Sequence, residues 1–321
     1  MNPGRRPRTP HPEPGSHPAD GLPPVRAREP PTGRSNPRTG TLNLTSSSLR
    51  APASHLERAL ARARGQERAA LAAYLPAGYP TLDQSLDALH LLATTADVIE
   101  IGLPYSDPLM DGPLIQRAAE QALRAGFRTE HLFTTVRELA AASNAALVVM
   151  TYWQPVHHYG PARFAQRLAA AGGAGVVIPD LPVEEASDWL SAAHEHHLDT
   201  VFVVAPNATD QRLARVCAAA SGMVYAPATT GVTGSQGPLH PGLPAFIDRL
   251  RTLTHLPVGV GIGVSTPEQA AIVGTYADAV IVGSAFIRAL DSAPGPAGAL
   301  QAAFLAQRLT DGLLRSRPAA A

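Results

Sequence analysis

An acidic side chain, Glu100, stands inside the largely apolar run 96–103, which has the composition of a buried strand. The run ends in a loop rich in Pro, Gly and Asp that carries Asp107 and Asp111. A buried carboxylate is costly unless it has a partner or a chemical role. Two acids in different surroundings can divide acid and base work, because burial moves their pKa values apart. The stretch therefore offers candidates for a catalytic pair, with Glu100 on a strand and Asp107 or Asp111 in the following loop.

The same residues also have a purely structural interpretation. A glutamate in a strand can pair with a core arginine, and aspartates in loops commonly cap helices. Pro113, two residues after Asp111, suits the first turn of a helix. The rest of the chain decides between the two interpretations.

Glycine-rich elements follow three later apolar runs and are typical of a phosphate site. They occupy residues 230–234, 261–265 and 282–285. Glycine lets backbone amides approach an anion, and a helix N-terminus favours negative charge. Ordinary turn glycines are the alternative interpretation, but the joint placement of these elements after successive strands favours phosphate binding.

Eight apolar runs, each followed by a helical pattern, supply the scaffold. The runs are 70–75, 96–103, 145–150, 175–178, 200–204, 223–226, 257–260 and 279–282. Helices are predicted at 55–65, from Thr81 or Asp83 to about 93, at 113–124, 129–142, 163–171, 183–196, 210–220 and 243–252, near 266–268, and at 297–315. Continuous apolar runs are typical of parallel strands covered by helices. The pattern predicts a single (β/α)8 TIM barrel with an extra N-terminal helix.

A doubly wound open sheet is the alternative fold. Such sheets usually carry a Gly-rich dinucleotide turn after their first strand, and the turn at 76–80 does not fit that pattern. Residues 1–50 contain eleven prolines and few large apolar side chains, which predicts a disordered Pro/Arg-rich extension. The predicted organisation is therefore this extension, a catalytic barrel over 51–316 and a tail at 317–321.

Composition excludes several classes of function. Formal net charge is zero, which gives no indication of a nucleic-acid or anionic membrane partner. No apolar run has the length of a membrane span, and the single cysteine, Cys217, suits a reducing compartment. We therefore expect a cytoplasmic protein. The histidines show no zinc-like spacing, so no metal site is predicted.

The sequence contains no lysine. A Schiff base requires a lysine amine, so the chain cannot run Schiff-base aldolase chemistry or hold pyridoxal phosphate covalently. A Walker-type phosphate loop is excluded for the same reason.

Several motifs in the same order resemble the tryptophan synthase alpha chain family. The stretch 99–113, IEIGLPYSDPLMDGP, is similar to the family signature nearly position for position. Further matches are 177–182, 205–207, 231–234 and 261–265, and the resemblance extends from about 55 to 315. It implies a TIM barrel that cleaves indole-3-glycerol phosphate to indole and glyceraldehyde 3-phosphate in tryptophan biosynthesis.

The resemblance also implies roles for individual residues. Glu100 would protonate indole C3 and help to remove the glycerol hydroxyl proton, while Asp111 would stabilise the indole N–H as charge develops there. Tyr152, Tyr225 and Thr233 match substrate-binding positions, and the phosphate-binding positions are Gly234, Gly263, Gly283 and Ser284. Core packing with a satisfied hydroxyl is the alternative for the two tyrosines.

The family further implies a partner and no cofactor in this chain. A tryptophan synthase beta chain would hold pyridoxal phosphate, condense indole with serine and complete an alpha2-beta2 tetramer. Three alternatives stay open: a stand-alone lyase that releases free indole, a non-catalytic barrel that activates a beta chain, and an isomerase of phosphorylated sugars. The presence of both Glu100 and Asp111 argues against the second, and the chain shows no further strand-borne acid–base set for the third.

Overall fold

The structure is a computed structural model that describes residues 53–228, 239–261 and 263–315. Residue contacts divide the chain into Met1–Leu49 and Arg50–Ala321, and all described residues belong to the second unit. The predicted disordered extension over 1–50 and the tail at 317–321 lie outside the described residues.

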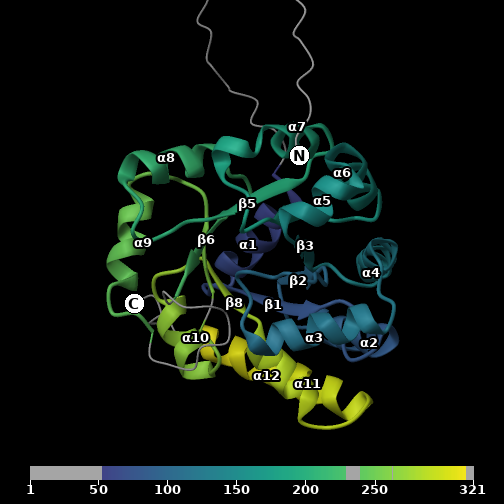
Figure 1. The fold of residues 1–321 in the computed structure, drawn as a ribbon. Helices are drawn as coiled ribbons and strands as arrows, with labels where there is room; N and C mark the ends of the chain where they lie inside the picture. The colour runs from purple at the N-terminus through teal and green to yellow at the C-terminus, as the bar shows by residue number, and fades with distance from the viewer. Residues whose placement is uncertain (1–52, 229–238, 262, 316–321) are drawn as a thin grey trace, which may run out of the picture. The chain divides into compact units, whose positions relative to one another are not determined.

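Eight parallel strands close into a barrel in chain order, with β1 paired to β8 (Figure 1). This confirms the predicted (β/α)8 fold. The strands are β1 Ala70–Pro76, β2 Val98–Gly102, β3 Ala146–Met150, β4 Gly175–Val177, β5 Asp199–Val203, β6 Val224–Pro227, β7 Val258–Gly261 and β8 Ala279–Val282.

Helices surround the strands (Figure 1). Apolar side chains of each α-helix belong to the hydrophobic core. They are α1 His55–Gly65, α2 Leu82–Ala93, α3 Pro113–Arg124, α4 Thr129–Ala142, α5 Trp153–Tyr159, α6 Pro161–Ala170, α7 Ser187–Glu195, α8 Asp210–Ala219, α9 Leu243–Arg251, α10 Pro267–Gly274, α11 Ser284–Asp291 and α12 Pro296–Leu314, with a 3-10 turn at Val183–Glu185. The predicted bounds of α1, α3 and α4 agree with the structure residue for residue.

Two helical segments differ from the predictions. The helix predicted over 183–196 is broken at Ala186, whose backbone leaves the helical conformation at ψ 4° while its side chain is fully buried. The short helices α5 and α11 are absent from the predicted list of elements. Pro155 lies in the first turn of α5, where its missing N–H costs no helical hydrogen bond.

The additional helix α1 lies at the N-terminal end of the barrel. Its N-cap Ser54 forms a capping box with Glu57, and Leu56 is fully buried. Arg62 donates to the carbonyl of Asn144, just before β3. The helix therefore closes the barrel at the end where the strands begin.

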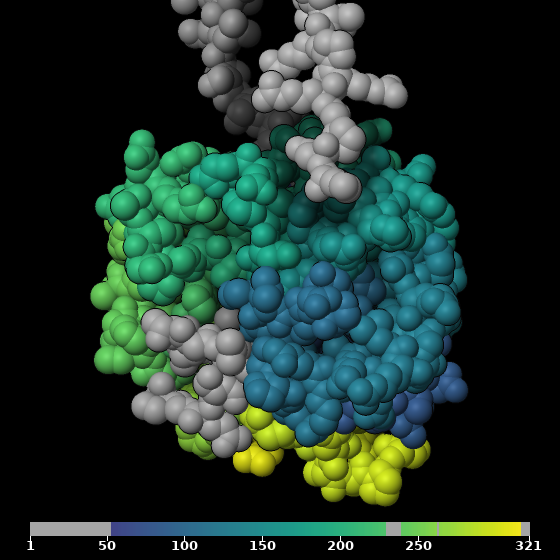
Figure 2. Space-filling view, in the orientation of Figure 1, coloured from purple at the N-terminus to yellow at the C-terminus, as the bar shows by residue number. Residues whose placement is uncertain are grey.

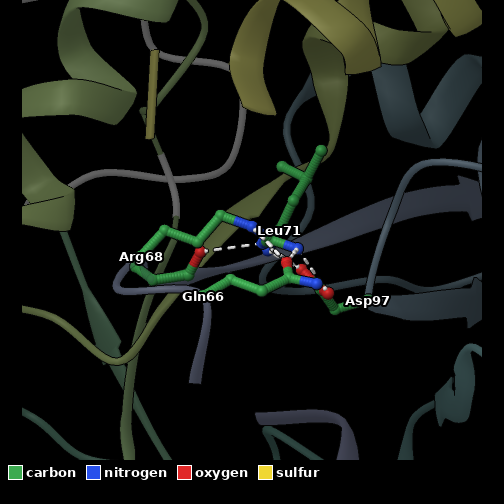
Figure 3. Close-up of polar contacts among 5 residues, drawn as sticks. Gln66, Arg68, Leu71 and Asp97 are labelled. Carbon is green, nitrogen blue, oxygen red and sulfur yellow. Dashed lines mark hydrogen bonds and ion pairs between the residues drawn. The ribbon is translucent and has the colours of Figure 1, made fainter. Parts of the chain in front are cut away.

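A buried ion pair fixes the same end of the barrel (Figure 3). Arg68 donates to both carboxylate oxygens of Asp97 at 2.6 and 2.9 Å, and its remaining N–H groups bond to Gln66 and to the carbonyl of Ala69. Asp97 also accepts the backbone N–H of Leu71 at 2.8 Å, which joins the start of β2 to β1. Every donor of this guanidinium group has a partner, which is the condition under which a buried ion pair is tolerated.

Asp278 repeats this arrangement in a more exposed setting. It precedes β8 as Asp97 precedes β2, and it accepts the backbone N–H of Val258 on β7 at 2.9 Å. Its arginine partner, Arg251, donates at 3.1 Å from a side chain that is 44% exposed. The two aspartates thus tie two pairs of neighbouring strands together near the start of each strand.

Candidate active site

The carboxyl ends of the strands surround an open cavity of about 670 Å³, a volume that includes its mouth. Six of the residues predicted from the sequence line it: Glu100, Asp111, Tyr225, Gly263, Gly283 and Ser284. Tyr152 lies beside Asp111, as described below. Thr233 and Gly234, the remaining two predicted positions, lie outside the described residues.

Glu100 occupies the middle of β2 and is 5% exposed. The strand pairs on both sides, with Tyr74 of β1 and Val148 of β3 as the register neighbours of Glu100. Burial raises the pKa of Glu100 to about 8, and the nearby Asp111 carboxylate contributes to the rise. Glu100 therefore holds a proton at neutral pH and can deliver it to a bound molecule.

Asp111 ends the loop that leaves β2 and is also 5% exposed. Gly112 caps α3 and Pro113 begins it, and the side chain of Gln116 donates to the carbonyl of Asp111 at 2.7 Å. Burial raises the pKa of Asp111 to about 6, while hydrogen bonding with the Tyr152 hydroxyl acts in the opposite direction. Asp111 is thus ionised at a pH at which Glu100 is still protonated.

Tyr152 fixes the loop that carries Asp111. Its hydroxyl accepts the backbone N–H of Met110 at 3.1 Å, and its ring lies 5.4 Å from that of Tyr105, centroid to centroid. The side chain is 1% exposed. The structure therefore places Tyr152 in contact with the loop and the acid.

Two tyrosines on the strands fit against glycines on the next strand. An added Cβ at Gly261 would lie 2.1 Å from the Tyr225 hydroxyl, and one at Gly102 would lie 2.5 Å from the Tyr74 hydroxyl. Tyr74 also lines the cavity, and it is absent from the residues predicted from the sequence. The sequence gives no signal that separates Tyr74 from the other side chains of the continuous apolar run that forms β1.

A helix N-terminus opens into the cavity next to Tyr74. Gly283 is the N-cap of α11 and Ser284 is its first residue, and both line the cavity. Gly263, with φ +109°, contributes from the loop after β7. The first N–H groups of a helix lack intrahelical partners and attract anions. This corner of the cavity can therefore hold a phosphate group.

Asp180, in the loop after β4, accepts the backbone N–H of Trp153 at 2.8 Å and so caps α5.

Among residues 53–228, 239–261 and 263–315, no three His, Cys, Asp or Glu side chains gather closely enough to share a metal ion.

A closed (β/α)8 barrel with two buried acids at the carboxyl ends of its strands defines a barrel enzyme of the acid–base class. A sequence model described as "Tryptophan synthase alpha chain" matches residues 60–310. The chain therefore belongs to the tryptophan synthase alpha chain family. It is a carbon–carbon lyase of that family, whose members cleave indole-3-glycerol phosphate in tryptophan biosynthesis.

Individual relatives support the family assignment. The chain is 52% identical over 241 residues to the tryptophan synthase alpha chain of Acidothermus cellulolyticus, which covers 74% of this chain and 90% of the relative. The alpha chain of Streptomyces avermitilis is 49% identical over 244 residues, covering 76% and 88%. A solved structure of Mycobacterium tuberculosis tryptophan synthase matches with a TM-score of 0.76 and 44% identity, over 81% of this chain and 98% of that chain.

Proposed function

We propose that this chain is the alpha subunit of a tryptophan synthase, with Glu100 and Asp111 as its catalytic pair. One observation carries the assignment of the pair: two buried carboxyl groups line one cavity, and their pKa values are about 8 and about 6. At pH 7 the first is a proton donor and the second is a carboxylate.

Glu100 can serve both proton transfers of the retro-aldol reaction. In its protonated form it gives a proton to indole C3, which makes the ring an electron acceptor. The resulting carboxylate then removes the proton from the glycerol hydroxyl next to the ring. The carbon–carbon bond breaks, its electrons return to the indole ring, and Glu100 is protonated again. One acid–base group of this kind contributes about 10²–10⁴-fold to the rate.

Asp111 stabilises the charge that this first step creates. Protonation of C3 places positive charge on the indole nitrogen, and an ionised carboxylate that accepts its N–H bond lowers the energy of that state. Met110 and Ile115, on either side of Asp111 in the chain, supply apolar lining for the indole ring. Glu100 thereby acts at C3 of the indole, and Asp111 acts at its nitrogen.

We propose that the phosphate of the substrate binds at the corner of the cavity formed by the loops after β7 and β8. We assign it to Gly263, Gly283 and Ser284 at the N-terminus of α11, and we extend the assignment to Gly234 by family resemblance. Tyr225 and Tyr152 are assigned to the substrate-binding region on the same basis, as is Thr233 in the loop after β6.

A beta chain is the proposed partner, and it would supply pyridoxal phosphate and consume the indole. The loop after β2 presents Leu109, which is 78% exposed, and Met110 beside the catalytic Asp111. Blue atoms from the part of the chain that includes this loop and α3 lie at the middle of the visible face in Figure 2. A partner that covers this loop would both bury apolar surface and act on the position of Asp111.

No helix among the described residues is long and apolar enough to cross a membrane. The single cysteine suits a reducing compartment and supports the proposal that the chain works in the cytoplasm.

The test measures indole release from indole-3-glycerol phosphate by the full chain, with and without a beta chain. Glu100→Gln and Asp111→Asn are compared with Glu138→Gln, which changes an exposed glutamate on α4. We expect slow indole release by the chain without its partner and a large increase in rate with the beta chain. Glu100→Gln and Asp111→Asn should abolish indole release under both conditions, whereas Glu138→Gln should behave like wild type. Fast release without the partner would instead assign a stand-alone lyase. No release under any condition would overturn the catalytic proposal.

A further inference from the structure

Tyr74 lies beside Glu100 on the inner face of the barrel. The two residues are register partners on the neighbouring parallel strands β1 and β2, and both line the cavity. Register partners on adjacent strands point to the same face of a sheet. The Tyr74 side chain therefore enters the cavity next to the acid.

Glycines on both sides determine where the Tyr74 ring goes. An added Cβ at Gly102 would lie 2.5 Å from its hydroxyl oxygen, and one at Gly283 would lie 3.1 Å from its Cδ1 atom. Gly102 is two residues beyond Glu100 on β2, so it faces the same side and lies nearer the mouth. The ring thus runs from Gly283 to Gly102, where its hydroxyl ends, two residues beyond Glu100 on the same face of β2.

The Tyr74 hydroxyl is available as a hydrogen-bond donor. The side chain is 7% exposed, and within the described part of the chain its hydroxyl has no hydrogen-bond partner. Burial raises the pKa of Tyr74 well above its usual value, and the nearby carboxyl groups of Asp111 and Glu100 add to the rise. The group therefore keeps its proton at every pH at which the enzyme would work.

We propose that Tyr74 is a further catalytic residue, whose hydroxyl donates a hydrogen bond to the substrate oxygen that becomes the aldehyde oxygen. The inference rests on the proposed function, because that function defines the reacting oxygen. A substrate whose phosphate lies at Gly283 and whose indole lies between Glu100 and Asp111 must lay its glycerol carbons along the Tyr74 ring. The oxygen attached to the carbon next to the indole then lies at the hydroxyl end of that ring.

The hydrogen bond would assist the step in which the carbon–carbon bond breaks. The proton leaves the substrate hydroxyl for the Glu100 carboxylate, the carbon–oxygen bond becomes double, and the electrons of the broken bond return to the protonated indole. Negative charge grows on the oxygen as its proton leaves. A donor fixed in a buried cavity stabilises that charge without having to reorient.

The experiment compares wild type, Tyr74→Phe and Tyr276→Phe, each as the full chain with a beta chain. Phenylalanine keeps the ring in the glycine slot and removes only the hydroxyl. Tyr276 is a matched control, because it is a half-buried tyrosine just before β8, at the opposite end of the barrel. Steady-state indole release gives kcat, and thermal unfolding of each variant verifies the fold. Binding of intact substrate is measured by calorimetry in a Glu100→Gln background, with and without Tyr74→Phe.

We expect Tyr74→Phe to lower kcat about 10- to 100-fold, the range for loss of a hydrogen bond to a charged group. The substrate Kd should change by less than about threefold, and Tm should stay unchanged. Tyr276→Phe should match wild type in all three quantities. If kcat of Tyr74→Phe stays within about twofold of wild type, the inference is overturned. It is also overturned if the substrate Kd rises by the same factor by which kcat/KM falls, because the hydroxyl would then contribute only to substrate binding. Wild-type protein without indole release would instead overturn the proposed function, and the inference with it.

Discussion

The hydroxyl oxygen of Tyr225 lies 2.1 Å from the position that the first side-chain carbon of any residue replacing Gly261 would occupy. Tyr225 is on β6 and Gly261 ends β7, so the ring leans across one strand boundary inside the barrel. The Tyr225 ring can occupy this position only because Gly261 has no side chain.

Gly261→Ala should therefore displace the Tyr225 ring and reduce both stability and activity. Overpacking of a closed core typically costs about 1–3 kcal/mol. In a Tyr225→Leu background, Gly261→Ala should lower the free energy of unfolding much less, because leucine does not reach the position of the added methyl group. Urea unfolding of the two single variants and the double variant gives the coupling energy. Additive losses would show that the two positions are independent.

The pH dependence of kcat/KM should be bell-shaped. Activity should rise as Asp111, with a pKa of about 6, ionises, and fall as Glu100, with a pKa of about 8, loses its proton. The two groups interact, so the limbs report apparent values for the pair. Asp111→Asn should remove the acidic limb along with most of the activity. A single limb in wild type would contradict the division of roles.

Tyr152→Phe should shift the acidic limb to higher pH. The Tyr152 hydroxyl holds the pKa of Asp111 down by hydrogen bonding, and that effect is lost when the hydroxyl is removed. The hydroxyl also accepts the N–H of Met110, so the loop should loosen and the substrate KM should rise. A pH profile of indole release measures the first effect, and Tyr159→Phe, at a half-buried tyrosine on α5, serves as the control. An unmoved limb would show that Tyr152 acts on the loop alone.

Glu100→Gln should stabilise the fold at alkaline pH. The pKa of Glu100 is about 8 in the folded chain and close to 4.5 when exposed, so the folded state binds the extra proton between these values. The contribution of Glu100 to stability is therefore full below about pH 4.5 and is lost as pH rises toward 8. The variant should exceed wild type in Tm at pH 8 and match it near pH 4.5. Equal Tm differences at both pH values would refute this linkage.

Arg68→Met should destabilise the chain by about 3–5 kcal/mol, since it leaves the Asp97 carboxylate buried without its cation. The matched change Arg251→Met removes the partner of the less buried Asp278 and should cost below about 1 kcal/mol. Urea unfolding of the two variants measures both losses. Indole release at low temperature should stay near wild type in both, because neither arginine reaches the cavity.

The sequence carried enough information to predict the barrel, and it singled out acids and glycines that the structure brings to one cavity. The apolar runs are buried strands because parallel strands are covered on both faces, and Glu100 stands out in such a run whatever surrounds it. The predicted roles of Glu100, Asp111 and the remaining candidate residues stay predictions until the variants are measured.

Other features depend on partners that are distant along the chain. The start of α5 relies on Asp180, 27 residues after Trp153, and local pattern gives no sign of it. In the sequence, Tyr74 is simply one aromatic residue in an apolar strand. Its place beside Glu100 follows only from the strand register and from the space that Gly102 and Gly283 leave for its ring. Such relationships require the closed barrel.

The two aspartates that tie the strand starts, Asp97 and Asp278, lie at the opposite end of the barrel from the chemistry. The groups that hold the strands in register and the groups proposed to meet substrate are therefore on separate sets of loops. We expect that loops at the carboxyl ends can be exchanged for those of another barrel without disturbing the contacts of Asp97 and Asp278 at the starts of the strands. This separation makes the chain a suitable recipient for grafted substrate specificity, with Arg68 and Asp97 as the residues to leave untouched.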